Sequence, residues 1–230
     1  MIMGINFVEK IDKLVKVQTV LISVSDKTGL ETLVPGLLKI NPKIEILSTG
    51  GTYKKIKKIL GDKKAATVLT QVSDYTGQPE TKGGLVKTLD FKIYLGILTE
   101  TYNDSHQNDL KRTDAIPIDM VIVNLYPFEE TIDKDDVTPE MARGNIDIGG
   151  PCMIRASAKN CLRVSSVVDP RDYSIILKEL SENNGNITFD LRLDLAIKAF
   201  EHTAYYDRVI ADYLANKSAD DFSACYPDVV

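Results

Sequence analysis

Two short turns in this sequence have the composition of an anion-binding site. Residues 25–29 (SDKTG) and 49–52 (TGGT) each follow an apolar run and precede a helical pattern. Glycine lets the backbone approach a ligand closely, free amides at a helix N-terminus favour an anion, and Ser and Thr hydroxyls are further donors. Lys27 would add a full positive charge. The same residues also suit helix caps and tight turns, so each turn alone leaves both interpretations open.

Three further segments carry residues that could do chemistry. They are residues 81–89 (TKGGLVKTL), residues 124–128 (NLYPF), and residues 147–150 (DIGG) followed by 156–160 (ASAKN). The first has the composition of a phosphate loop but lacks the spacing G-x-x-x-x-G-K-[ST]. Each also has a plain structural interpretation: a basic loop, a proline that ends a strand, and an N-cap aspartate with a solvated lysine. None of the three establishes chemistry by itself.

The elements that must position these residues follow a β-α-β-α-β order. Apolar runs at 20–24 and 44–47 predict buried strands, and a third strand is expected at 66–69. Helices are expected at 30–38, from an apolar stripe at helical spacing, and at 53–60. This order is typical of a parallel sheet covered by helices. It places both turns at the carboxyl ends of strands, where open parallel sheets bind ligands.

The remainder of the chain predicts one main domain with flanking segments. Residues 70–90 lack periodicity, as in a functional or disordered loop. We expect an N-terminal helix within 1–17, a domain at 18–217 and a loosely ordered tail at 218–230. The expected helices are 5–16, 138–144, 150–160, 171–182 and 189–216, and the expected strands are 93–98, 119–124 and 164–168. In the long helix, a stripe at helical spacing predicts packing by Leu195, Ala199, Phe200, Thr203 and Tyr206.

Composition excludes several classes of protein. A net charge of −5 without a long basic run gives nucleic acid no electrostatic footprint. The three cysteines match no zinc spacing and indicate a reduced, cytoplasmic protein with free thiols. The apolar runs are too short to span a membrane, and the charges at 9–13 exclude a signal peptide. The chain has two histidines and lacks G-x-S-x-G, H-E-x-x-H and G-x-G-x-x-G, which disfavours serine hydrolases, zinc proteases and dinucleotide enzymes.

Taken in order, these segments resemble the IMP cyclohydrolase family. Its members form the N-terminal domain of a bifunctional purine enzyme that also carries an AICAR formyltransferase. The resemblance extends over about residues 18–216. The matching stretches are residues 23–30, 48–52, 72–80, 83–84, 86–89, 124–128, 146–150, 158–160 and 198–207.

The resemblance implies a fold and an activity. The fold is α/β and methylglyoxal-synthase-like, with three layers, a central mostly parallel sheet flanked by helices, and a C-terminal helical extension. The activity is ring closure of 5-formamidoimidazole-4-carboxamide ribotide (FAICAR) to IMP and water, the last step of de novo purine biosynthesis, with no metal or organic cofactor. A cytoplasmic homodimer is expected, without nucleic-acid or membrane partners. Because the transformylase half is missing from these 230 residues, we expect a stand-alone protein supplied by a separate AICAR formyltransferase.

The resemblance also implies the site residues. Asp147 matches an acceptor for the carboxamide N–H, and Lys87 and Tyr126 match donors to the developing oxyanion. Lys159 matches a group that protonates the departing hydroxyl. Both turns are expected against the phosphate and ribose, and residues 86–88 against the base. The implied substrate-binding residues are Ser25, Asp26, Lys27, Thr49, Gly50, Gly51, Thr52, Val86, Thr88, Val123, Asn124, Ile148 and Gly149.

This chain departs from the family pattern beside Lys87. The family reads R-V-K-T-L-H-P where this chain has Leu85, Asp90 and Phe91, and H-x-G-I-L where it has Tyr94. A cation and a titratable ring are lost, and Asp90 could pair with Lys87. Two other interpretations therefore stay open. One is a catalytically impaired nucleotide-binding or regulatory protein, and the other is a different enzyme of the same fold, such as a methylglyoxal-synthase-like lyase.

Overall fold

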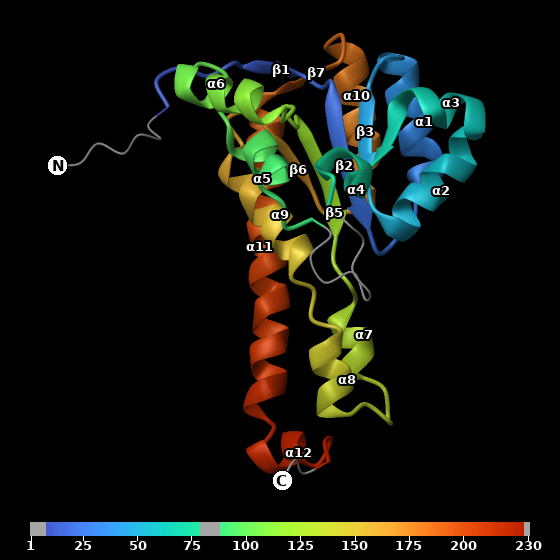
Figure 1. The fold of residues 1–230 in the computed structure, drawn as a ribbon, viewed down its shortest axis with the longest axis vertical. Helices are drawn as coiled ribbons and strands as arrows, with labels where there is room; N and C mark the ends of the chain where they lie inside the picture. Colours follow the sequence, from blue (N-terminus) through green and yellow to red (C-terminus); the bar gives the residue numbers. More distant parts are fainter. Residues whose placement is uncertain (1–7, 79–87, 228–230) are drawn as a thin grey trace, which may run out of the picture.

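A parallel sheet of five strands forms the centre of the molecule (Figure 1). The computed structural model describes residues 8–78 and 88–227. The strand order is β4-β3-β2-β5-β6. A separate antiparallel ribbon joins β1 to β7. The strands are β1 Leu14–Lys16, β2 Thr19–Val24, β3 Glu45–Ser48, β4 Leu69–Gln71, β5 Met120–Asn124, β6 Ser165–Val167 and β7 Asn186–Thr188.

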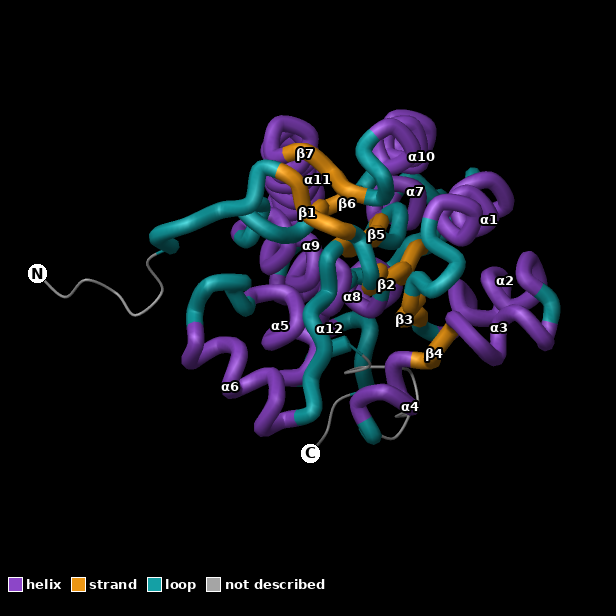
Figure 2. The backbone as a smooth tube through the Cα atoms, turned by 90° about the horizontal axis from the view of Figure 1, so that it is seen from above, coloured by secondary structure: helices purple, strands orange, loops and turns teal. Residues whose placement is uncertain are grey.

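Helices cover both faces of the sheet, and each face has its own hydrophobic core (Figure 2). The central strand β2 shows why: Val20 and Ile22 belong to one core and Leu21 to the other, because successive side chains of a strand point to opposite faces. One core packs against α1 Leu30–Ile40, α2 Gly50–Leu60 and α10 Tyr173–Glu182. The other packs against α5 Phe91–Leu98, α9 Gly149–Lys159 and α11 Phe189–Ala215. The predicted three-layer α/β fold is confirmed.

A helical arm extends from the sheet (Figure 1). It contains the second half of α11, which runs beside the short helices α7 Phe128–Ile132, α8 Pro139–Gly144 and α12 Ala219–Ser223. The hydroxyl of Tyr205 on α11 donates to Glu129 Oε1 on α7 at 2.5 Å, and Tyr226 donates to Glu140 on α8. Helices α11 and α12 of this arm are the C-terminal helical extension that the resemblance implied.

The remaining elements connect the layers. They are α3 Asp62–Val68, α4 Val72–Thr76, α6 Asp104–Thr113 and the 3-10 turn η2 Pro170–Asp172. Among the helices of residues 8–78 and 88–227, none has both the length and the apolar character needed to cross a membrane.

The predicted N-terminal helix at 5–16, within 1–17, is wrong where the structure describes it. Residues 8–13 have no helix, and 14–16 form β1, while 1–7 lie outside the described residues. The amphipathic pattern is overridden by pairing with a strand remote in sequence: β1 pairs with β7, and the amide of Phe189 donates to the Lys13 carbonyl. The expected loosely ordered tail is also wrong over 219–223, because Ser218 and Asp221 form a capping box that starts α12.

One predicted strand is helical instead, and another begins later than predicted. Residues 66–68 end α3, so β4 begins only at Leu69. Residues 93–98 belong to α5, where Asp90 is the N-cap and its Oδ1 accepts from the Lys92 amide at 2.8 Å. Ile93 and Ile97 are fully buried, one helical turn apart on the core face. The expected loop at 70–90 contains helix α4 in its described part.

Candidate functional site

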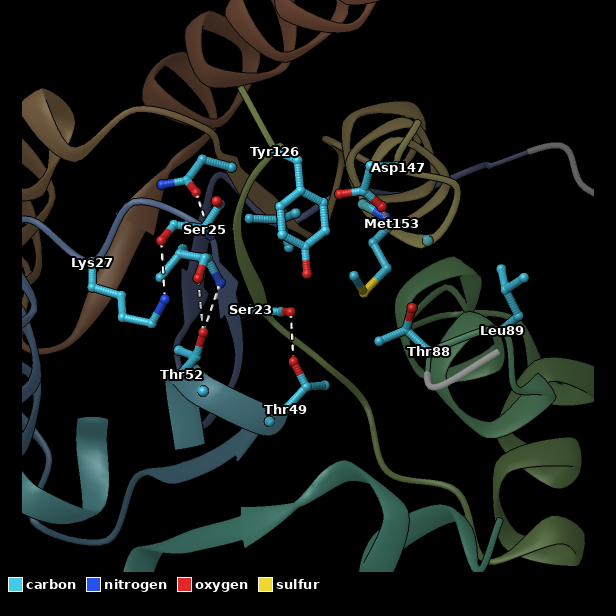
Figure 3. Close-up of a pocket in the computed structure, with 17 residues that line it drawn as sticks. Ser23, Ser25, Lys27, Thr49, Thr52, Thr88, Leu89, Tyr126, Asp147 and Met153 are labelled. Carbon is cyan, nitrogen blue, oxygen red and sulfur yellow. Dashed lines mark hydrogen bonds between the residues drawn. The ribbon is translucent and has the colours of Figure 1, made fainter. Parts of the chain in front are cut away.

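A pocket of about 280 Å³ lies at the carboxyl ends of β2, β3 and β5 (Figure 3). The N-termini of α2 and α9 face it from two sides. The lining residues are Ser23, Val24, Ser25, Lys27, Thr49, Gly50, Gly51, Thr52, Thr88, Leu89, Val123, Asn124, Tyr126, Asp147, Gly149, Gly150 and Met153. The two turns that the sequence singled out therefore meet at one site.

One side of the pocket, the anion end, is formed by Lys27, the hydroxyls of Ser23 and Thr49, and the N-terminus of α2. Lys27 Nζ donates to the Ser25 carbonyl at 3.0 Å, and a Cβ placed on Gly51 would lie 3.6 Å from Lys27 Cε. The ammonium group thus lies along the first turn of α2. The hydroxyls of Ser23 and Thr49 are 2.7 Å apart. Positive charge, hydroxyl donors and helix amides together suit a phosphate group.

Two polar side chains hold the anion end in shape. The hydroxyl of Thr52 accepts from the Val24 amide and donates to the Val24 carbonyl, each at 3.0 Å. Asn124 Oδ1 accepts from the amides of Ser25 and Asp26, at 2.6 and 2.9 Å, and its Nδ2 donates to the Asp26 carbonyl. These bonds engage the Asn124 amide group, which therefore fixes the backbone of residues 25–26 beside the pocket.

The opposite side, the carboxylate end, is formed by Asp147, Tyr126 and the N-terminus of α9. Asp147 Oδ1 accepts from the Gly150 amide at 2.9 Å. Burial raises the pKa of the Asp147 carboxyl above its ordinary value, although hydrogen bonds from the amides of Gly150, Tyr126 and Gly149 oppose that shift. The side chain of Tyr126 is 58% exposed, and its hydroxyl points into the pocket (Figure 3). A proton acceptor and a hydrogen-bond donor thus face the same space.

Backbone glycines make the carboxylate end possible. A Cβ on Gly150 would lie 2.5 Å from Asp147 Oδ2 and 2.6 Å from Leu125 Cδ2, and one on Gly149 would collide with the Thr88 hydroxyl. Both distances at Gly150 are shorter than side-chain contacts tolerate. Among the described residues, no group of three or more His, Cys, Asp or Glu side chains could hold a metal ion.

The structure brings most of the predicted residues together, with three exceptions in the described chain: Asp26, Ile148 and Lys159. Asp26 does not line the pocket and caps its own turn, with its Oδ1 accepting from the Thr28 amide at 2.9 Å. Hydrogen bonds from Thr28 lower the Asp26 pKa. Ile148 is exposed and does not line the pocket. Val86 and Lys87 lie outside the described residues.

Lys159 lies far from the pocket within its own chain. It is the last residue of α9, whose first residue, Gly149, lines the pocket, and ten residues of helix rise about 15 Å. The next residue, Asn160, donates to the carbonyls of Ile97 and Thr99, beside the Arg163–Asp119 ion pair at the start of β5. The exposed Lys159 therefore belongs to the opposite edge of the sheet. That placement does not support proton transfer from Lys159 to a ligand in this pocket of the same chain.

Asp90 has a structural role in this chain. It is 5% exposed, caps α5 through Oδ1, and accepts from Gln78 Nε2 through Oδ2 at 2.6 Å. Both carboxylate oxygens are therefore bonded within the described chain. The departure from the family at this position accompanies a well-capped helix, and the expected pairing with Lys87 falls outside the described residues.

Five lining residues were not predicted from the sequence: Ser23, Val24, Leu89, Gly150 and Met153. Ser23 is the one polar residue in the apolar run 20–24, which was a usable signal. Met153 follows Gly149 by one helical turn, so it shares the pocket-facing side of α9. Gly150 belongs to a motif already noted, but only the close approach of Asp147 reveals why it must be glycine.

Comparison with known protein families connects this geometry to relatives. The MGS-like domain family matches residues 29–152, which include the second turn at 49–52, Tyr126 and Asp147. The chain belongs to the MGS-like domain family. The AICARFT/IMPCHase bienzyme family matches residues 157–228 of the same MGS-like protein. The resemblance to the IMP cyclohydrolase family is confirmed by these two matches together.

This MGS-like domain is also similar to individual proteins and to a solved structure. It is 45% identical over 198 residues to the bifunctional purine biosynthesis protein PurH of Synechococcus sp. (strain CC9605), covering 86% of this chain and 37% of that protein. It is 47% identical over 201 residues to PurH of Bacillus cereus (strain B4264), covering 87% and 38%. The chain thus spans somewhat more than a third of these relatives. The crystal structure of ForH is similar with a TM-score of 0.70 and 32% identity, covering 84% of this chain and 97% of that one.

Proposed function

We propose that this MGS-like domain is an IMP cyclohydrolase, which closes the six-membered ring of FAICAR to give IMP and water in de novo purine biosynthesis. The observation that carries the proposal is a single pocket with an anion end for the 5′-phosphate and a carboxylate end for the reacting groups. The PurH relatives, named as bifunctional purine biosynthesis proteins, support the same pathway. A cytoplasmic homodimer supplied by a separate AICAR formyltransferase belongs to this proposal.

The reaction needs orientation more than it needs a second reactant. The carboxamide nitrogen of FAICAR attacks its own formyl carbon, a tetrahedral adduct forms, and loss of water completes the ring. Because both groups are on one molecule, the protein gains most by holding the rotamer in which they touch. Anchoring the phosphate at Lys27 and α2 fixes one end of the ligand, and the carboxylate end then acts on the other.

Asp147 and Tyr126 have the chemistry that the two proton movements require. The Asp147 carboxylate accepts the carboxamide proton as the C–N bond forms, and its raised pKa makes it a better base than a solvated aspartate. The Tyr126 hydroxyl donates to the formyl oxygen as negative charge develops there. Lys87, by its family position, would be a second donor to that oxygen. No cofactor takes part in the proposed reaction.

Conversion of synthetic FAICAR to IMP, followed by absorbance against a buffer blank, tests the proposal. Turnover well above the blank is expected of the wild-type chain. No turnover, with tight IMP binding retained by calorimetry, would instead indicate a nucleotide-binding protein that has lost catalysis. Turnover of a triose phosphate in place of FAICAR would indicate a lyase of the same fold.

Lys27→Met should weaken binding of IMP about 10- to 100-fold, because a hydrogen bond to a charged group contributes about 1.5–3 kcal/mol. Binding of inosine, which lacks the phosphate, should be unchanged. Lys58→Met is the matched control, since it removes an equal charge from the exposed last turn of α2. Calorimetry of both ligands with both variants measures the effect. Equal loss of inosine and IMP affinity in Lys27→Met would contradict a phosphate contact.

Lys159→Ala should change turnover by less than about threefold, because its side chain is exposed at the far end of α9 and an exposed substitution has only a small effect. The FAICAR assay at saturating substrate measures it, with thermal unfolding as the check on folding. If a well-folded variant lost turnover, the lysine would have to enter the site from a second copy of the chain.

A further inference from the structure

Helix α11 reaches the back of the carboxylate end through Tyr206. The Tyr206 hydroxyl accepts a hydrogen bond from the backbone amide of Asp147 at 2.8 Å, across 59 residues of sequence. Tyr206 is 7% exposed and does not line the pocket. It therefore contacts the backbone of a proposed catalytic residue without facing the ligand.

An aromatic cluster fixes the Tyr206 ring. Phe128 packs edge-to-face against Tyr206, with ring centroids 6.3 Å apart, and against Tyr213, with centroids 5.8 Å apart. Phe128 follows Tyr126 by two residues at the start of α7. Helix α11 thus packs against both segments of the carboxylate end. One segment follows β5, and the other precedes α9.

The Asp147 segment depends on this brace because it has little regular structure of its own. Residues 145–148 connect α8 to α9 and belong to neither helix. The carboxylate is fixed from one side by the Gly150 amide, and the peptide N–H by the Tyr206 hydroxyl on the other. Together these bonds define the direction in which the side chain leaves the backbone. Without the Tyr206 hydroxyl, the half-buried backbone N–H of Asp147 loses its hydrogen-bond partner. Rotation of that peptide would let the N–H bind water instead.

We propose that Tyr206 is a positioning residue of this site, whose hydroxyl orients the Asp147 carboxylate through the Asp147 backbone amide. The proposal rests on the proposed function for its catalytic consequence, but the hydrogen bond itself is testable without turnover. Sequence periodicity predicted only a packing role for Tyr206. In the structure its hydroxyl also accepts the hydrogen bond from the Asp147 amide.

Two tyrosines of α11 allow a matched pair of variants for this test. Tyr206→Phe removes the hydroxyl that binds Asp147 and keeps the ring. Tyr213→Phe removes a buried hydroxyl that has no partner within the described chain, and it keeps a ring packed against the same Phe128. Each variant is compared with the wild type in three measurements: FAICAR turnover, hydrogen exchange of the Asp147 amide, and NMR titration of the Asp147 carboxyl carbon. Thermal unfolding confirms that both variants fold.

Tyr206→Phe should lower kcat about 10- to 100-fold with KM nearly unchanged, since a small displacement of a reacting group has effects of that order. It should also speed exchange of the Asp147 amide and move the carboxyl titration midpoint down, toward the value of a solvated aspartate. Tyr213→Phe should match the wild type in all three. If Tyr206→Phe left exchange and midpoint at their wild-type values, the proposal would be overturned, whatever its turnover.

The two NMR measurements separate this proposal from the proposed function. If the wild-type chain showed no turnover, the cyclohydrolase proposal would fail, while faster exchange and a lower midpoint in Tyr206→Phe would still support the positioning role. If Tyr206→Phe did not fold, slow exchange of the Asp147 amide in wild-type protein, relative to the rate of an unstructured peptide, would be the deciding measurement. Unprotected exchange there would overturn the proposal.

Discussion

Asp147→Asn should lower the turnover of FAICAR about 10²- to 10⁴-fold, the range by which a positioned proton acceptor contributes to catalysis. The asparagine keeps the size of the side chain, and its oxygen can still accept from the Gly150 amide as Asp147 Oδ1 does at 2.9 Å. What it cannot do is take the carboxamide proton. We therefore expect kcat to fall and the affinity for IMP to remain within a few fold.

The pH dependence of the wild-type chain gives an independent check. Burial raises the Asp147 pKa, so the acid limb of turnover should lie above the pH at which an ordinary aspartate ionises, and activity should rise with pH through that limb. The limb should be missing from whatever residual activity Asp147→Asn retains. Full activity of the wild type at pH 4 would contradict the role of Asp147 as the base.

The same pKa shift predicts a gain in stability for Asp147→Asn. A raised pKa in the folded state means that the folded chain holds this proton more tightly than the unfolded chain. Stability from Asp147 is therefore full below the unfolded pKa of about 3.8 and is lost as pH rises through the folded pKa. At neutral pH the variant, which never ionises, should melt at the same temperature as the wild type or higher. A clearly lower Tm would show that the carboxylate stabilises the fold.

Gly150→Ala should damage both the fold and the reaction. Its Cβ would lie 2.5 Å from Asp147 Oδ2 and 2.6 Å from Leu125 Cδ2, so the carboxylate or the backbone must move. Overpacking of this kind destabilises by about 1–3 kcal/mol. For a chain of this length each kcal/mol lowers Tm by about 2–4 °C. Displacement of the carboxylate should reduce kcat about 100-fold.

Gly144→Ala is the control for Gly150→Ala. Gly144 ends α8, and a Cβ placed on it would meet no described atom within 4 Å beyond its chain neighbours and the backbone of its own helix. Alanine also has the higher helix propensity, so this variant should equal or slightly exceed the wild type in Tm and match it in turnover. Differential scanning calorimetry and the FAICAR assay measure both variants. Equal behaviour of the two alanines would show that the close approach of Asp147 to Gly150 places no constraint on the site.

Local sequence patterns predicted the central strands of the sheet better than the elements around them. The apolar runs at 20–24 and 119–124 became β2 and β5, because a strand buried on both faces has an apolar residue at nearly every position. The strand predicted at 93–98 was wrong for a related reason: α5 is also apolar nearly all round, and a short apolar run does not distinguish the two structures. The cap at Asp90 was the signal that decided between them.

The candidate site was predictable where backbone geometry follows from residue type. Glycine and hydroxyl residues after predicted strands identified both turns, and the parallel order brought them together. Contacts across long sequence distances were not predictable. Neither the bond from Asn124 to the Ser25–Asp26 backbone nor the one from Asp147 to Tyr206 leaves a periodic trace. The displacement of Lys159 from the pocket depends on the direction of α9, which a motif alone does not specify.

The ribbon of β1 and β7 has a consequence for the order in which the chain can fold. It joins residues 14–16 to residues 186–188, and the buried Arg192 on α11 donates to the Asp12 carbonyl at 2.7 Å. During vectorial synthesis, the first strand must therefore wait without its partner until almost the whole domain has left the ribosome. Closing so long a loop is a late and entropically unfavourable step. Helix α11, which contacts the Asp147 segment through Tyr206, is thus among the last elements to pack. A nascent or truncated chain would form its sheet before it forms a competent pocket.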